Sequence, residues 1–358
     1  MLNIAIELLK TFNDHNFKAY IVGGFERDLY INKKSIDVDI CTDATPKQIK
    51  EIFENCKINE YGSVSLIYCN IRFEITTFRK ELKYENNRYP VKIKYIDNLL
   101  EDLLRRDFTI NTLCINSKGE YIDLLGAKED IDNKIIKSVG DSNKKIKQDI
   151  LRSLRAIRFA TILNFKLDDK LKKSIKKNKK LLKKLSYFRK KEELEKIFSS
   201  QNCKYGLELL KELELDKVLE IKTDITITTS SLGIWAQQET LNYPFSKNEK
   251  EIIKNIKLAL KEDILNNNIL YKYGLYICTL VGEIKNIDRV EIVKKYNSLP
   301  IFGVKDIKIK ADQICEILNK NKGPFIKEIY KDLEGMILNG LLQNNYDEIK
   351  KYLEHKFI

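Results

Sequence analysis

Predicted strands are confined to about the first 140 residues of this 358-residue chain. The strand patterns fall at residues 18–22, 36–41, 64–69 and 71–78. Thr45, a favoured helix N-cap, precedes a helical pattern over residues 46–54, so strands and helices alternate in this part. After Asp141 the apolar residues recur at helical spacing and strand patterns nearly vanish. The sequence therefore predicts an α/β head, with a small mixed sheet and helices, followed by an all-α remainder.

Composition limits the chemistry that the chain can perform. Its 7 cysteines are scattered without a CxxC pair, which favours reduced, buried thiols over a zinc site or a disulfide framework. Only 2 histidines are present, so we expect carboxylates and cations to carry any catalysis. No apolar run approaches the ~18 residues of a membrane helix. Residues 1–12 lack the basic-then-apolar order of a signal peptide, which predicts a cytoplasmic protein.

The formal net charge of +13 favours a polyanionic partner. Segment 166–191 holds 13 basic residues against two acids, Asp168 and Asp169. Its leucines still recur at helical spacing, so the segment on its own favours a helix pair with a solvated lysine face. The functional alternative is a surface that follows the phosphates of a nucleic acid.

The first candidate site combines a Gly-Gly turn with two aspartates. Gly23 and Gly24 end a predicted strand, so their amides can face a phosphate, and Arg27 lies one helical turn later. Asp37 and Asp39 are spaced i, i+2 on a predicted strand, so both carboxylates project to the same side. Such a pair favours a bound cation, and its oxygen ligands suit Mg²⁺, which aligns the reacting groups in phosphoryl transfer. The alternative is a solvated loop with two surface aspartates.

Two further segments could extend this site. Glu74 lies between apolar residues of a predicted central strand, where it either completes a metal site or forms a salt bridge with Arg72 or Arg79. Segment 104–111 contains two arginines, Arg106 being the second, with an acid and an amide. Such a set can bind phosphate and ribose hydroxyls together, although a capped helix end would have the same composition.

A third motif, in segment 148–160, has one acid followed by three arginines at intervals of three residues. These residues are Asp149, Arg152, Arg155 and Arg158. Successive members are neighbours on a helix, and an apolar stripe beside them would anchor it. Arginines beside such a stripe are usually salt-bridged at the surface, but three arginines against one acid leave positive charge for an anionic ligand. The Asp and Arg pair also offers the acceptors and donors needed to read the edge of a base.

In this order, the motifs resemble those of the class II tRNA nucleotidyltransferases, the CCA-adding enzymes, which share their head with bacterial poly(A) polymerases. The similar segments are 23–39 (first motif), 105–111 (ribose-selecting motif), 121–126 (head–neck coupling), 148–160 (amino-acid template) and 189–194 (neck motif). These specific motifs cover about the first 200 residues, and the tail resemblance, over 312–342, is softer.

The resemblance implies a four-part protein that adds C, C and A to the 3′ end of tRNA from CTP and ATP, without a nucleic-acid template, and releases pyrophosphate. Its parts would be a nucleotidyltransferase head (1–140), a neck with the nucleotide-selecting helix (141–200), a body (201–300) and a tRNA-binding tail (301–358). Asp37 and Asp39 would be catalytic and would hold Mg²⁺. The residues that would contact the incoming nucleotide are Gly24, Arg27, Arg106, Asp149, Arg152, Arg155 and Arg158. No membrane partner is implied, and a homodimer is left open.

Three places depart from the family pattern. One is segment 87–90, before Asn98, where a second arginine is common; residues 87 and 88 lie outside the residues that the structure describes. Glu26 stands where an apolar residue is usual before Arg27. Gln148 stands where an acid usually precedes Asp149; it can still hydrogen-bond but brings no charge to support Arg152.

Three other functions remain as alternatives. The nearest is a poly(A) polymerase or a partial enzyme that adds only CC or only A. Segment 80–101 is full length, which favours A addition or complete CCA addition, since relatives that add only CC tend to lack this segment. A catalytically inactive RNA-binding protein is disfavoured because Asp37 and Asp39 are both present. A nicotinamide-binding enzyme is disfavoured because Gly23 and Gly24 do not form a G-x-G-x-x-G motif.

Overall fold

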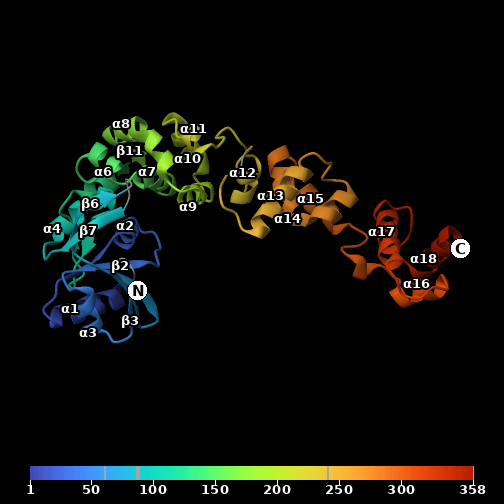
Figure 1. Cartoon of the computed structure of the whole chain (residues 1–358), viewed down its shortest axis with the longest axis horizontal. Helices are drawn as coiled ribbons and strands as arrows, with labels where there is room; N and C mark the ends of the chain where they lie inside the picture. Colours follow the sequence, from blue (N-terminus) through green and yellow to red (C-terminus); the bar gives the residue numbers. More distant parts are fainter. Residues whose placement is uncertain (60–61, 86–88, 240–241, 358) are drawn as a thin grey trace. The chain divides into compact units, whose positions relative to one another are not determined.

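The computed structural model describes residues 1–59, 62–85, 89–239 and 242–357, with only the backbone in the described part of 82–92. The chain divides into two compact units, Met1–Thr223 and Asp224–Ile358 (Figure 1). The expected division into head, neck, body and tail is finer than these two units and stays a prediction.

One mixed sheet forms the centre of the first unit. Across the described residues it has seven strands in the order β3-β4-β5-β2-β1-β8-β9. The strands are β1 (Ala19–Val22), β2 (Val38–Thr42), β3 (Cys56–Ile58), β4 (Ser63–Tyr68), β5 (Ile71–Thr77), β8 (Cys114–Ile115) and β9 (Tyr121–Ile122). β2 and β5 run parallel, whereas the other neighbouring pairs are antiparallel. The small mixed sheet predicted for the head is confirmed.

Local sequence signals explain how the chain enters these elements. The hairpin between β4 and β5 turns at Cys69 and Asn70, both at positive φ, as a tight hairpin turn requires. Thr45 caps the next helix in a capping box with Gln48, confirming the predicted N-cap. The head helices are α1 (Leu2–Asp14), α2 (Gly24–Tyr30), α3 (Pro46–Ile52), α4 (Leu99–Leu104), η1 (Thr109–Asn111) and α5 (Ala127–Asp132). In Figure 1, α1 and α3 lie beside the sheet, and their apolar residues share one core with it.

Two smaller strand pairs complete the β-structure of the described chain. β6 (Arg79–Glu85) and β7 (Tyr89–Tyr95) form an antiparallel hairpin, which belongs to the segment that the sequence marked as full length. β10 (Ile135–Ile136) and β11 (Lys166–Leu167) pair in parallel and join the head to the helices that follow.

Helices follow the head, as predicted. In the first unit they are α6 (Ser142–Gln148), α7 (Leu151–Leu163), α8 (Asp169–Asn178), η2 (Lys179–Lys184), α9 (Tyr187–Phe198), α10 (Cys203–Glu212) and α11 (Asp216–Leu219). In the second they are α12 (Ser231–Ala236), α13 (Lys247–Ala259), α14 (Asn267–Lys285), α15 (Arg289–Asn297), η3 (Val304–Asp306), α16 (Ala311–Ile317), α17 (Phe325–Leu338) and α18 (Tyr346–Phe357).

Three further observations concern Trp235, the cysteines and membrane spans. Trp235 is fully buried and packs on Tyr243 and Phe245, so it is a core residue of the second unit. The seven cysteines are all unpaired thiols, but the expected burial holds for only four of them, since Cys56 and Cys315 are half-buried and Cys69 is exposed. Among the described residues, no helix is both long and apolar enough to cross a membrane.

Candidate active site

A pocket of about 360 Å³ in the first unit gathers most of the predicted site. Its lining comes from the β1–α2 turn, β2, β6, segment 105–111 and the start of α7. The lining residues are Gly23, Gly24, Arg27, Asp39, Glu81, Arg105, Arg106, Asp107, Asn111, Asp149, Arg152, Arg155 and Phe159. Of the predicted residues, the lining includes all except Asp37 and Arg158.

The pocket is rich in charge but nearly balanced. Its described lining holds five arginines and four acids, so the surplus is a single positive charge. A nucleoside triphosphate brings several negative charges with it. A surplus of one positive charge cannot neutralise a triphosphate. An additional cation in the pocket would supply the missing positive charge.

Gly23 shapes the floor of the pocket next to Asp39. Its φ of 118° lies in the region that residues with a side chain rarely adopt. A Cβ built on Gly23 would lie 3.2 Å from Oδ2 of Asp39. The absence of a side chain therefore leaves open space beside this carboxylate.

We expect Gly23→Ala to lower kcat/KM for nucleotide addition by about 10- to 100-fold, since backbone strain costs about 1–3 kcal/mol and the new methyl group crowds Asp39. The matched control is Gly126→Ala, because Gly126 also has positive φ but a Cβ there would meet nothing within 4 Å. Activity per folded molecule is the measurement. Equal losses in both variants would show that only backbone strain matters.

Asp39 is well placed to bind a cation. It pairs in register with Glu74 across β2 and β5, so both carboxylates lie on the same face of the sheet. Asp39 exposes surface to the pocket, yet desolvation by the surrounding protein raises its pKa. The charge of Arg106 lowers this pKa, whereas the charges of Glu74 and Asp37 raise it further. Carboxylates that disfavour one another's charge fit a divalent cation.

Asp37 differs from its prediction. β2 begins at Val38, where the ladder with Phe73 starts, so Asp37 lies just before the strand and is exposed. The argument from strand alternation therefore holds for Asp39 but does not place Asp37. Glu74 takes the salt-bridge alternative, since Arg72 Nη2 lies 2.8 Å from its Oε1. Within the described chain, no three His, Cys, Asp or Glu side chains form a cluster that could hold a metal.

Arg27 is buried and held in place from two sides. Its Nε and Nη2 donate to Asp28 Oδ1 at 2.9 and 2.7 Å, and its Nη1 donates to Asn111 Oδ1 at 2.6 Å. Glu26, the unusual neighbour, is fully buried, and its carboxylate accepts no hydrogen bond from the described residues. Burial raises its pKa well above the usual value, so the neutral acid is favoured and fills the position of an apolar residue.

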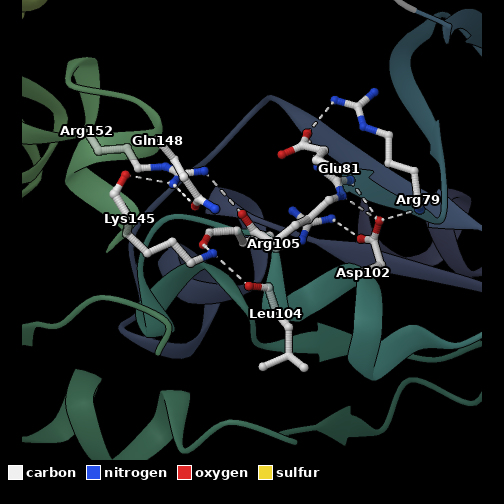
Figure 2. A network of polar contacts seen from close by, with 9 residues as sticks. Arg79, Glu81, Asp102, Leu104, Arg105, Lys145, Gln148 and Arg152 are labelled. Atoms are coloured by element: carbon white, nitrogen blue, oxygen red, sulfur yellow. Dashed lines mark hydrogen bonds and ion pairs between the residues drawn. The ribbon is translucent and has the colours of Figure 1, made fainter. Parts of the chain in front are cut away.

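Asp102 contacts both arginines of the 105–111 motif, and Figure 2 shows it beside Arg105. It is fully buried, and its carboxylate lies 2.8 Å from Arg105 Nη2 and 3.2 Å from Arg106 Nη2. Glu81 lies 3.7 Å from Arg105 and 3.3 Å from Arg79, which connects the β6–β7 hairpin to the same network. These ion pairs therefore hold Arg105 and Arg106 in place where they line the pocket.

Asp107 ties this motif to α7. Its Oδ2 accepts from Nε and Nη2 of Arg155 at 2.8 and 2.6 Å. Burial alone would raise the pKa of Asp107, but Arg155 and the charge of Arg152 outweigh it and hold the pKa well below its usual value. Asn111 also donates to this carboxylate. Asp107 is thus an ionised anchor for Arg155.

Three arginines lie close to the aromatic ring of Phe159. The guanidinium carbons of Arg27 and Arg155 each lie 5.4 Å from its ring centroid, and that of Arg158 lies at 4.2 Å. Arg158 Nε is also 2.9 Å from Glu193 Oε2. Arg158 therefore lies against Glu193 of α9 and, unlike Arg27 and Arg155, does not line the pocket.

The motif at 148–160 is not one continuous helix. Gln148 ends α6, Asp149 is extended (φ −142°, ψ 103°), and α7 begins at Leu151. Asp149 Oδ1 accepts from the amide of Leu151, the first residue of α7, at 3.0 Å, and Ile150 between them is the N-cap. Expecting Asp149 and Arg152 as neighbours on one helix was therefore wrong, yet both line the pocket.

Arg152 is buried, and both terminal nitrogens of its guanidinium donate to oxygens of the protein. Nη1 donates to the carbonyl of Lys145 at 3.0 Å and to Gln148 Oε1 at 3.4 Å. Nη2 donates to the carbonyl of Arg105 at 3.3 Å. Gln148 thus supports Arg152 by a hydrogen bond although it lacks the charge of the usual acid.

Sequence reasoning did not single out Glu81, Asp102, Lys145 or Phe159. Asp102 carried a weak signal, as an acid three and four residues before two arginines on a predicted helix. Phe159 directly follows Arg158 within the same motif, but an aromatic residue there also fits a core role. Lys145 lies in an ordinary run of lysines, and nothing local distinguished it.

Comparisons with known proteins agree with this fold and site. Residues 19–137 match the family model "Poly A polymerase head domain", 164–222 the model "Probable RNA and SrmB- binding site of polymerase A", and 223–353 a model of "tRNA nucleotidyltransferase domain 2". Sheet, pocket and family models together define a template-independent nucleotidyltransferase.

Full-length relatives narrow the class. The chain is 31% identical to the CCA-adding enzyme of Geobacillus sp. (strain WCH70), covering 98% of this chain and 96% of the relative. It is 32% identical to that of Ligilactobacillus salivarius, covering 98% and 97%. The CCA-adding enzyme of Bacillus stearothermophilus, solved in complex with CTP, superposes with a TM-score of 0.83 at 25% identity, covering 99% and 96%. The chain belongs to the family of CCA-adding enzymes.

Proposed function

We propose that this chain adds C, C and A to the 3′ end of tRNA from CTP and ATP, without a nucleic-acid template, and releases pyrophosphate. The observation that carries the proposal is the pocket, where Asp39, the arginines and the Asp149–Arg152 pair open into one space. Triphosphate and base can therefore be bound together by protein side chains. The family membership supports the same reaction, as does the relative solved with CTP.

Members of this enzyme class generally use a divalent metal. We propose that Asp37 and Asp39 hold Mg²⁺ here, since Asp39 is open to the pocket and lies close enough to Asp37 for their charges to interact. When bound there, the cation supplies the positive charge that the nearly balanced pocket lacks. The two aspartates then act as catalytic residues by fixing its place beside the incoming nucleotide.

The remaining residues divide into two roles. Gly24, Arg27, Arg106 and Arg155 lie on the wall that would meet the triphosphate. Asp149 and Arg152, at the start of α7, would meet the edge of the base. A direct nucleotide contact by Arg158 stays a prediction, and its place beside Phe159 and Glu193 favours an indirect role.

The test is addition to defined tRNA ends. Purified protein is incubated with tRNA ending before, within or after CCA, using labelled CTP and ATP. Addition of C, C and A that stops at CCA supports the proposal. Addition of A alone to tRNA ending in CC would identify an A-adding enzyme, and long A tails would identify a poly(A) polymerase. Binding without addition would indicate an inactive RNA-binding protein.

We propose that tRNA is also contacted by the tail (301–358) and by the lysine-rich segment (166–191). We also propose that the protein acts in the cytoplasm. Part of the lysine face is already paired: Lys172 lies 2.9 Å from Glu212, Lys176 lies 2.7 Å from Glu214, and Lys179 also bonds to Glu214. The hydrogen bonds from Lys176 and Lys179 lower the pKa of Glu214 to about 2. The acids in these ion pairs offset the positive charge of the three lysines, which therefore attract a nucleic acid less strongly.

Their neighbours Lys173, Lys177 and Lys180 are exposed on the same two helical segments. Replacing these three by Gln should flatten the dependence of log Kd for tRNA on log salt, by about 0.7–0.9 for each phosphate that the variant no longer neutralises. Replacing the three paired lysines by Gln is the matched control and should change the slope less. An unchanged slope in the first variant would favour the solvated-face interpretation.

A further inference from the structure

Three successive backbone carbonyls at the C-terminal end of α4 are bound by two side chains, one from α6 and one from α7. Lys145 Nζ donates to the carbonyls of Leu104 at 2.7 Å and Arg106 at 2.9 Å. The carbonyl between them, that of Arg105, accepts from Arg152 Nη2 at 3.3 Å. Carbonyls at the end of a helix lack partners within the helix, and cations suit them. Figure 2 shows Lys145 and Arg152 side by side on this segment.

Lys145 is also joined to Arg152 directly. Its backbone carbonyl accepts from Arg152 Nη1 at 3.0 Å, while its side chain fixes the peptides on both sides of the carbonyl that Arg152 Nη2 binds. Two of the acceptors of Arg152 therefore depend on where Lys145 lies. Lys145 is not part of the pocket lining, so it touches Arg152 and not the space for the nucleotide.

The charge of Lys145 depends on its surroundings. Burial lowers its pKa to about 7, and the charges of Arg152 and Arg105 act in the same direction, whereas Asp107 and Glu81 oppose them. The amine is thus protonated below about pH 7 and increasingly neutral above it.

We propose that Lys145 is a positioning residue for base selection: it locks Arg152 against the Leu104–Arg106 segment so that the guanidinium meets the base edge in one orientation. The inference rests on the proposed role of Arg152 in choosing the nucleotide. A side chain that reads hydrogen bonds must be held by supporting contacts, since a loose guanidinium could satisfy a wrong base as well as the right one.

The experiment compares Lys145→Met with Lys144→Met, a neighbour on the same helix whose side chain is exposed. We expect Lys145→Met to lower the ratio of kcat/KM for CTP over UTP by roughly tenfold, the order of effect of losing one hydrogen bond to a charged group. Lys144→Met should keep the parent ratio. In an Arg152→Ala background, Lys145→Met should cause no further loss of the ratio, because it acts through that arginine.

Two measurements keep the proposal open to failure if Lys145→Met folds poorly. Lys145→Arg, which stays charged, should retain most of the selectivity. The parent ratio should also fall as pH rises above about 7, because the two hydrogen bonds of Lys145 weaken when the amine loses its charge, whereas the ratio of Lys145→Arg should stay flat.

The possible outcomes distinguish a failure of the role proposed for Lys145 from a failure of the proposed function. If Arg152→Ala changes the ratio and Lys145→Met only slows addition of all nucleotides alike, Lys145 is a structural joint and the inference is wrong. If neither variant changes the ratio, the selecting role of Arg152 fails, and the inference fails with it. Absence of any nucleotide addition by the parent would instead refute the proposed function itself.

Discussion

Replacing Asp39 by Ala is expected to abolish nucleotide addition and leave the fold nearly intact. Asp39 accepts no hydrogen bond from the other described residues, and it faces the pocket, so its removal leaves no buried partner unsatisfied. In the proposed metal site its charge holds the cation, and cation stabilisation of the transferring phosphate is worth several kcal/mol. The rate should therefore fall by about a thousandfold or more. Addition to tRNA ending before CCA is the measurement.

Asp37→Ala should behave in the same way if both aspartates hold the metal. Glu74→Gln is the matched control, because this carboxylate is already engaged by Ser65 and Arg72 and should leave the rate close to that of the parent. Binding of Mn²⁺ and of tRNA provides readouts besides activity: the aspartate variants should lose the first and keep the second. Loss of folding in both variants, with unchanged catalysis per folded molecule, would make the acids structural.

Features decided by neighbouring residues were predicted well from the sequence. The hairpin at Asn70 and the cap at Thr45 depend on turn and capping preferences that act over a few residues. The change from strands to helices near Asp141 follows from the spacing of apolar residues alone. Motifs with fixed spacing also identified most of the pocket lining.

Pairings between distant segments could not be predicted in this way. Asp107 and Arg155 are 48 residues apart, and Lys145 and Leu104 are 41 apart, so nothing local couples them. Without its partner, Asp107 could equally bind a ribose, and Lys145 could equally be solvated. Glu26 is a similar case, since its burial and neutral form follow from the packing around α2.

The break at Asp149 shows how a regular spacing can mislead. Residues at intervals of three suggested one helix, but Asp favours positions before a helix, where its side chain binds a backbone amide. Here it accepts from Leu151, and the chain is extended at that point. Asp149 therefore reaches the pocket from the extended residue between α6 and α7, whereas Arg152 reaches it from α7 itself.

Replacing Arg152 by Ala is expected to relax nucleotide choice as well as to slow addition. Arg152 donates and Asp149 accepts, so they suit the edges of cytosine and adenine, where an amino donor lies beside a ring-nitrogen acceptor. Uracil and guanine present a carbonyl acceptor beside a ring N–H donor, which reverses the order. Each such contact contributes about 1–3 kcal/mol of discrimination in comparable side-chain readout of bases. The ratio of kcat/KM for CTP over UTP should therefore fall by about 10- to 100-fold.

Arg155→Ala is the control for this effect within the same helix. Arg155 also lines the pocket, but it is fixed by Asp107 and lies one turn further along α7, where a triphosphate rather than a base would meet it. Its loss should lower kcat/KM for CTP, ATP and UTP together and keep their ratios. Arg152→Lys, which retains the charge without the planar fork, should recover the rate better than the selectivity. If Arg152→Ala keeps the parent ratio while only its rate falls, Arg152 holds phosphate, and the choice of base is made elsewhere in the pocket.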